Sequence, residues 1–144
     1  MLLLLADGTQ VPVAELPGQG PWTFLVLQPD PAPPGPGFLT RFGRVVVPDL
    51  RGRPGWGAAP GEPGFPDLVD DLDQVRTRAG LGRPVLVGLD ELAPLARRAA
   101  ADQPWAWRGL VLMPPDDPAA VEALLGRLGP GPGWAGIAPD APPR

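Results

Sequence analysis

Six amino acids are missing from this sequence of 144 residues: serine, cysteine, histidine, tyrosine, lysine and asparagine. Serine, cysteine and histidine supply most enzymatic nucleophiles and proton shuttles, and cysteine and histidine bind soft metal ions. The lack of cysteine also excludes disulfides and leaves the redox compartment open. We therefore predict that the protein binds no metal and no cofactor.

The charge is acidic and shows no basic patch. All 12 basic residues are arginine, against 16 acidic residues, for a net charge of −4. Because an acidic surface repels phosphate backbones, we predict no binding to nucleic acid. The apolar run at residues 2–5 follows no basic residue and is too short for a signal segment or a membrane span. We expect a cytoplasmic protein that does not bind membranes.

Proline and glycine are abundant but are confined to connections. The 24 prolines and 20 glycines cluster in segments such as 29–37, 54–66 and 129–136, outside the apolar runs. The hydrophobic content of 44% is enough for a packed core. We therefore predict one folded domain over residues 1–128 and a Pro/Gly-rich tail over residues 129–144.

The chain opens with the pattern of a β-hairpin. An apolar run at residues 2–6 is followed by Asp7-Gly8, a strong turn signal, and by a returning strand at residues 10–16. Pro12 lies within that strand and predicts an edge position. Four continuous apolar runs have the length of strands buried on both faces, at residues 22–27, 44–47, 84–87 and 110–113.

Helical patterns separate the later strands. Residues 67–78 carry one apolar stripe, with Asp67 as a cap or Pro66 in the first turn. Asp90 is expected to cap a helix over residues 91–101, and Asp116 or Asp117 begins one that ends near residue 128. Parallel strands joined by helices predict an α/β three-layer sandwich. Its sheet is mixed and mostly parallel, with an N-terminal antiparallel hairpin.

Several stretches, in order, resemble the first half of an α/β-hydrolase. Residues 6–16 (ADGTQVPVAEL) resemble the opening hairpin, and residues 24–29 (FLVLQP) lie where the family has a strand ending in His-Gly. Residues 43–57 (GRVVVPDLRGRPGWG) are similar to the family pattern R-V-x-x-P-D-x-R-G-x-G. Residues 67–113 resemble its helix, strand, nucleophile elbow, helix and strand. The resemblance covers about residues 1–128 and implies a truncated α/β-hydrolase-like fold.

The resemblance places the nucleophile elbow at residues 88–92. The family pattern G-x-S-x-G sets a nucleophile on a strained strand-to-helix turn between small residues. This sequence reads Gly88, Leu89, Asp90, Glu91, Leu92, so Asp90 stands at the nucleophile position. Aspartate is a nucleophile in the dehalogenases and epoxide hydrolases of this fold, but their ester intermediate needs a histidine. We favour Asp90 as a helix cap and name no catalytic residue.

The rest of the family's machinery also departs from the pattern. Gln28, Pro29 and Asp30 replace the His-Gly segment that supplies an oxyanion-hole N–H, and the Asp30 carboxylate would repel a developing oxyanion. The family fold continues into two further strands that carry the acid and the histidine. No segment after residue 128 has strand length and apolar density, apart from residues 134–138.

Charged clusters outside the elbow have ordinary interpretations. Asp70, Asp71 and Asp73 predict a solvated helix face rather than a cation site. Arg51 and Arg53 lie in a Gly-rich loop, where we expect them to pack the loop or pair with Asp49 rather than hold an anion.

The tryptophans lie in two kinds of place. One of Trp105 and Trp107, next to the last buried strand, is expected in the core. Trp56 and Trp134 lie in Gly-rich loops, where an aromatic side chain anchors a loop or contacts a ligand.

Three functions remain open. The first is a non-enzymatic protein, a pseudoenzyme that acts through binding or homodimer assembly, because a fold truncated after the fourth parallel strand leaves an open sheet edge. The dimer would form across that edge or around the last helix. The second is a weak hydrolase of esters, epoxides or haloalkanes with Asp90 as nucleophile and Asp30, Asp116 or Glu91 activating water.

The third function is a small apolar ligand bound in the old active-site crevice. Open α/β sheets form clefts at the carboxyl ends of their strands. Leu89 and Leu92 are bulky enough to fill such a cleft. The loops expected to line it follow Leu27, Val47, Val87 and Met113.

Overall fold

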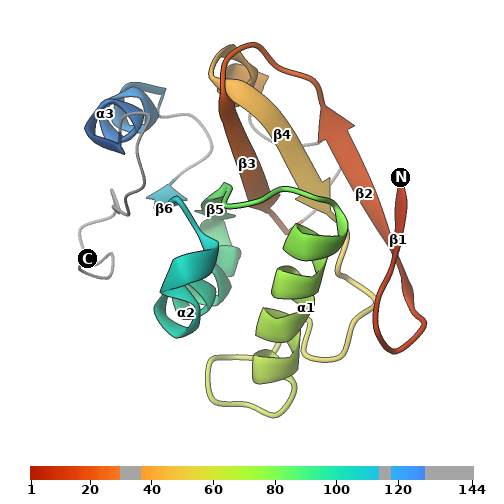
Figure 1. Cartoon of the computed structure of the whole chain (residues 1–144). Helices are drawn as coiled ribbons and strands as arrows, with labels where there is room; N and C mark the ends of the chain where they lie inside the picture. The colour runs from red at the N-terminus through yellow and green to blue at the C-terminus, as the bar shows by residue number, and fades with distance from the viewer. Residues whose placement is uncertain (30–36, 114–117, 129–144) are drawn as a thin grey trace.

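The computed structural model describes residues 1–29, 37–113 and 118–128. Six strands form one sheet in the order β1-β2-β4-β3-β5-β6 (Figure 1). The pairs among β4, β3, β5 and β6 are parallel, and β2 pairs antiparallel with β1 and β4. The strands are β1 (Leu2–Leu4), β2 (Gln10–Leu16), β3 (Trp22–Leu27), β4 (Gly43–Pro48), β5 (Val85–Leu89) and β6 (Gly109–Met113). The predicted mixed, mostly parallel sheet is confirmed.

Helices cover both faces of the sheet. The helices α1 (Phe65–Arg78) and α2 (Ala93–Asp102) pack on one face, where they bury one cluster of apolar side chains with the strands. The 3-10 helix η1 (Gly37–Arg41) and α3 (Pro118–Leu128) contribute to a second apolar cluster on the other face. Alternate residues of the central strands point to opposite clusters, as parallel strands buried on both faces require. Figure 1 shows α1 and α2 side by side, below the strands in this view.

The expectation that Pro12 marks an edge strand is wrong. The first half of β2 pairs with β1 and its second half pairs with β4, so β1 is the outer strand. The carbonyl of Pro12 accepts the N–H of Asp49 at 2.8 Å, just beyond the end of β4. In a strand, the N–H and C=O of one residue point to the same side. The place of the missing Pro12 N–H therefore lies beside the end of β4, where the sheet loses no hydrogen bond between strands.

The start of α1 differs from the sequence prediction in one respect. The helix α1 begins at Phe65, and its N-cap residue is Gly64 with φ of 94°, so Asp67 lies in the first turn and caps nothing. Pro66 takes the predicted place in that turn. The predicted tail at residues 129–144 lies outside the described residues, as do Asp116 and Asp117. No helix in the described ranges is both long and apolar enough to cross a membrane.

Candidate functional site

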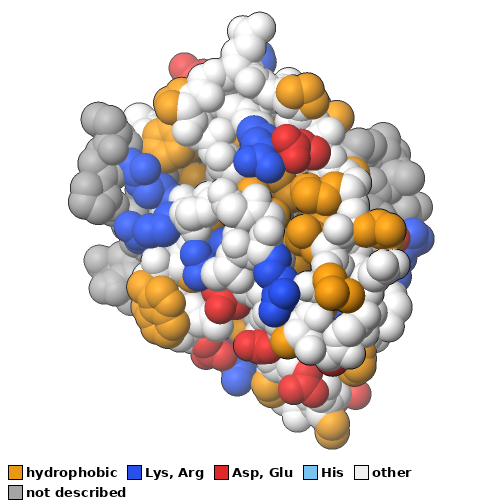
Figure 2. All heavy atoms as spheres, turned by 45° about the vertical axis from the view of Figure 1, so that its right-hand side comes forward, with side chains coloured by type: hydrophobic (Ala, Val, Ile, Leu, Met, Phe, Trp, Pro, Cys, Tyr) orange, Lys and Arg blue, Asp and Glu red, His pale blue; other side chains and the backbone are white. Residues whose placement is uncertain are grey.

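The loop between β4 and α1 is held by one arginine. The side chain of Arg53 is 9% exposed, and its Nε and Nη2 donate to both carboxylate oxygens of Asp71 on α1, at 2.9 and 3.0 Å. Its Nη2 also lies 2.9 Å from Oδ2 of Asp7 in the β1–β2 turn. One guanidinium therefore ties together the hairpin, the loop and the helix. Figure 2 shows the side of the molecule near β1 and β2, where basic and acidic side chains intermingle.

The contact of Asp7 predicts an acid-sensitive element of stability. The N–H of Thr9 and the Arg53 guanidinium lower the pKa of Asp7 from 3.8 to about 2. Because the folded state favours the carboxylate, Asp7 stabilises the fold above pH 3.8, and this contribution disappears as the pH falls towards 2. In urea unfolding, wild type is expected to exceed Asp7→Asn in stability near neutral pH, with the difference vanishing in acid. A difference that Glu122→Gln, an exposed control on α3, reproduces would contradict this origin.

The residues predicted to form the elbow lie in a strained turn, and we keep the word elbow for this segment, residues 88–92. The strand β5 ends at Leu89, the 3-10 helix η2 (Asp90–Leu92) follows, and α2 begins at Ala93. Asp90 has φ of 52°, the one positive φ of a residue other than glycine in the described part of the chain. Such a conformation costs about 1–3 kcal/mol and persists only where the surrounding structure imposes it. Asp90 is therefore exposed on a strained strand-to-helix turn, and its place as the nucleophile position of an elbow stays a prediction.

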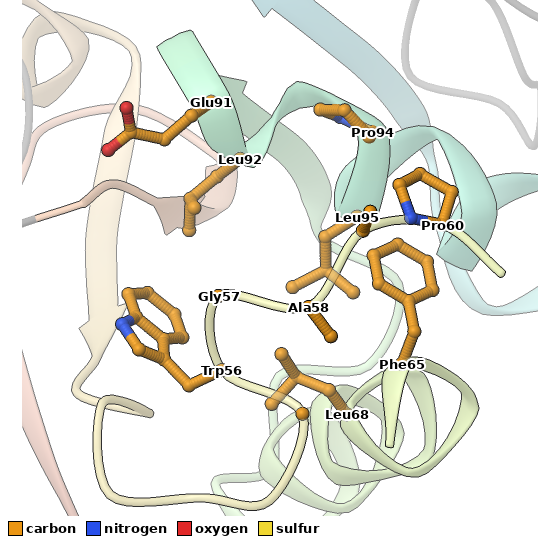
Figure 3. Close-up of a pocket in the computed structure, with 12 residues that line it drawn as sticks. Trp56, Gly57, Ala58, Pro60, Phe65, Leu68, Glu91, Leu92, Pro94 and Leu95 are labelled. Carbon is orange, nitrogen blue, oxygen red and sulfur yellow. The ribbon is translucent and has the colours of Figure 1, made fainter. Parts of the chain in front are cut away.

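Gly88 allows α2 to approach β5 closely. A Cβ at this position would lie 2.6 Å from Cβ of Ala96 and 3.2 Å from Cα of Ala93. The first small residue of the family pattern is therefore required here by packing. Leu92 occupies the position of the second small residue without preventing the turn, because its half-buried side chain points away into a pocket (Figure 3).

The predicted role of Asp90 as a helix cap is wrong. The N-cap residues of η2 and α2 are Leu89 and Leu92, and neither helix start has a side-chain cap hydrogen bond. Asp90 lies inside the first turn of η2 with a positive φ, whereas a capping residue has extended backbone angles. Within the described residues, no ion pair engages Asp90 or Glu91. Their carboxylates leave the elbow negatively charged.

A substitution at Asp90 measures the strain of the elbow. Asp90→Gly is expected to raise the free energy of unfolding by about 0.5–1 kcal/mol, because glycine adopts positive φ without the Cβ clash. Chemical denaturation of the two proteins checks this. Glu91→Gly is the matched control: its φ is not positive, so it is expected to destabilise. A loss of stability in Asp90→Gly would mean that the aspartate side chain stabilises the turn.

An apolar pocket of about 390 Å³ lies between the elbow and the β4–α1 loop. Trp56 and Leu92 flank one end of it, and Phe65, Leu68 and Leu95 line the other (Figure 3). The remaining lining residues are Gly55, Gly57, Ala58, Ala59, Pro60, Glu91 and Pro94. The volume falls within the range of about 300–1,000 Å³ that is typical of small-molecule sites.

The pocket agrees in part with the crevice expected from the sequence. It is lined by the loop that follows β4 and by the start of the segment that follows β5, as predicted. Leu92 narrows it, whereas Leu89 is 4% exposed and packs into the cluster on the other face. The segments after β3 and β6 lie in residues 30–36 and 114–117, outside the described ranges. The sequence alone did not predict Phe65, Leu68 and Leu95 as site residues. Apolar residues at helical spacing predict a place in the hydrophobic core and give no sign of a pocket.

The other charged candidates have structural partners. Arg51 forms a two-pronged ion pair with Asp49, both contacts at 2.9 Å, which is the pairing predicted for this loop. The prediction of a solvated acidic face on α1 is wrong for Asp71, which is 3% exposed and bound to Arg53. Asp73 pairs with Arg76 at 2.7 Å, and no set of three potential metal ligands gathers in the described residues.

The remaining predicted residues divide between the core and the undescribed segments. Trp107 is fully buried and Trp105 is 65% exposed, which confirms that one of the two belongs to the core. Gln28 and Pro29 follow β3 and are half-buried, but Asp30 lies outside the described residues. The role of this segment as a degenerate oxyanion loop therefore stays a prediction, as does any role of Trp134.

Solved structures show what kind of fold this is. An esterase from Thermogutta terrifontis is 26% identical, with a TM-score of 0.54 over 85% of this chain and 49% of the esterase. An esterase from Exiguobacterium antarcticum is 18% identical, with a TM-score of 0.56 over 77% and 43% of the two chains. An epoxide hydrolase of the α/β-hydrolase superfamily, from metagenomes of hot environments, is 18% identical, with a TM-score of 0.57 over 78% and 40%. No protein-family model and no curated protein matches the sequence.

These observations define a three-layer α/β protein with an elbow at the end of a central strand. More particularly, the chain has the α/β-hydrolase fold. It spans 40–49% of the length of the three structures above.

Proposed function

We propose that this chain is a non-catalytic member of its fold, a pseudoenzyme that binds a small apolar ligand in the pocket beside the elbow. The pocket itself carries the proposal, because it joins an apolar lining to the carboxyl-end position where open α/β sheets bind ligands. The sequence has no histidine to complete a nucleophile-and-base pair at Asp90. The missing histidine therefore favours ligand binding over catalytic turnover as the function of this site.

A cavity-filling variant tests the proposal. Small alkylbenzenes are the probes, and binding is followed through the NMR resonance of the Trp56 indole and by calorimetry. Ala58, a half-buried lining residue, points into the pocket (Figure 3). Ala58→Phe is expected to weaken binding by about tenfold or more while the protein stays folded. Ala101→Phe, on the exposed side of α2, is the matched control and should bind as wild type does.

A second candidate function is assembly into a homodimer across β6. In the described part of the sheet, β6 pairs with β5 and has no partner on its other edge. An apolar parallel strand in that position favours pairing with a second copy. Light scattering after size exclusion over a wide dilution series decides this: a dimer that survives dilution supports assembly. A monomer at micromolar concentration argues against it.

The strained backbone of Asp90 favours a third candidate, a residual hydrolase reaction. An Asp90 carboxylate oxygen would attack the carbon of a bromoalkane, forming a C–O bond while bromide leaves with the bonding electrons. Without a histidine to activate water, the resulting ester should accumulate, unless Asp30, Asp116 or Glu91 acts as base. Intact-mass measurement is expected to show one added alkyl group in wild type and none in Asp90→Asn. An unmodified wild-type chain, with no turnover of esters or epoxides, would remove Asp90 from consideration.

A further inference from the structure

Among the residues that the structure describes, those that line the apolar pocket carry charge of one sign. Glu91 is the single ionisable residue among those that line the pocket, and Asp90 precedes it at the tip of the elbow. Both are exposed, and no ion pair within the described ranges neutralises either. A ligand that reaches the mouth of the pocket therefore meets the uncompensated negative charge of Glu91, and Asp90, next to it in the chain, adds a second negative charge to the elbow.

The nearest arginines along the lining loop do not offset this field. Arg51 forms a bidentate ion pair with Asp49. Arg53 forms ion pairs with Asp71 and Asp7. Neither arginine lines the pocket. The basic residues of the β4–α1 loop are thus matched by carboxylates, whereas the elbow has carboxylates without matching bases.

The aromatic residue at the same end favours a cation as well. Trp56 is half-buried and lies on the side of the pocket where Leu92 and Glu91 are found, with the Glu91 carboxylate turned outward at the rim (Figure 3). An indole face attracts ammonium groups through its quadrupole, more strongly than the other aromatic rings do. Trp56 and Glu91 can therefore hold an ammonium at the mouth while the apolar interior takes a hydrocarbon body.

We infer that the pocket selects small organic cations: molecules with an apolar body and an amine or quaternary ammonium at one end. This selectivity rests on the proposed binding function and names the class of ligand for the same site. A carboxylate or sulfonate of the same shape is disfavoured, because the acidic elbow repels it and no arginine is among the described residues that line the pocket.

The test compares three benzyl compounds that differ in the charge of their heads: benzyltrimethylammonium, its neutral isostere neopentylbenzene, and benzylsulfonate. Calorimetry and the Trp56 indole resonance report binding. Benzyltrimethylammonium is expected to bind about tenfold more tightly than the neutral isostere. Benzylsulfonate is expected to bind more weakly than the neutral isostere, by about tenfold or more. The preference should shrink at high salt, because the Glu91 carboxylate is exposed.

Two variants separate charge from shape. Glu91→Gln is expected to lose most of the cation preference and keep neopentylbenzene binding, and Trp56→Leu to weaken the cation more than the neutral compound. Glu122→Gln, an exposed carboxylate on α3, should leave all three affinities unchanged. Equal binding of cation and isostere, or a preference that survives Glu91→Gln, overturns the selectivity but leaves the pocket as a binding site. Binding of none of the three overturns the selectivity together with the proposed function.

Discussion

Asp71→Ala is expected to lower the free energy of unfolding by about 3 kcal/mol, because it leaves the Arg53 guanidinium buried without its main partner. The pair is bidentate, and both side chains are less than 10% exposed, at 9% and 4%. Asp7 remains beside Arg53 at 2.9 Å, which keeps the loss near the lower end of what broken buried pairs cost. Urea denaturation gives the value, and a shift of tryptophan emission would report that the loop around Trp56 has loosened.

Two comparisons identify the cause of this loss. Asp70→Ala removes the neighbouring, exposed carboxylate and is expected to change stability by about 0.5 kcal/mol or less. The double variant Arg53→Met with Asp71→Leu replaces both charges by apolar groups and should recover most of the loss. An Asp71→Ala protein as stable as Asp70→Ala would show that the buried pair is not what holds the loop.

Gly88→Ala is expected to cost about 1–3 kcal/mol and to weaken ligand binding as well. The added methyl would meet Cβ of Ala96 at 2.6 Å, and a methyl group has no rotamer by which to move away. The helix α2 must shift instead, and it carries Leu95 at the pocket wall, with Leu92 just before its first residue. Thermal unfolding and probe titration measure both effects.

The compensating variant makes the steric origin testable. The double variant Gly88→Ala with Ala96→Gly removes the opposing methyl and should restore the close approach of α2 to β5. Its stability should return to that of wild type less about 1 kcal/mol, because glycine is unfavourable within a helix. Gly126→Ala on α3 is a control of opposite sign, since nothing lies within 4 Å of its added methyl and the helix gains propensity. If the double variant binds no better than Gly88→Ala alone, the contact with Ala96 is not the cause.

The sheet could be predicted from the sequence because its signals are local. The Asp7-Gly8 turn, the continuous apolar runs and the helical stripe on residues 67–78 each depend on neighbours in the chain. The β-hairpin, the parallel strands and the helices between them follow from such patterns.

The candidate site could be predicted only in part, because it depends on distant partners. Asp71 looked solvated until the fold brought Arg53, 18 residues earlier in the chain, against it. The positive φ of Asp90 occurs where α2 packs closely on β5, and the sequence carries no sign of it beyond the elbow position itself. The lining residues on the β4–α1 loop have no periodicity from which a pocket could be read.

The three-way attachment of Arg53 also has a consequence for the order of folding. Its two partners lie in the first turn of the chain and in α1, so the β4–α1 loop cannot settle until the hairpin and the helix have both docked. Contacts between distant segments form late, since the chain must first bring those segments together. Trp56 is carried by this loop, and its indole signal would therefore record the closing stage of refolding, after the sheet itself has assembled.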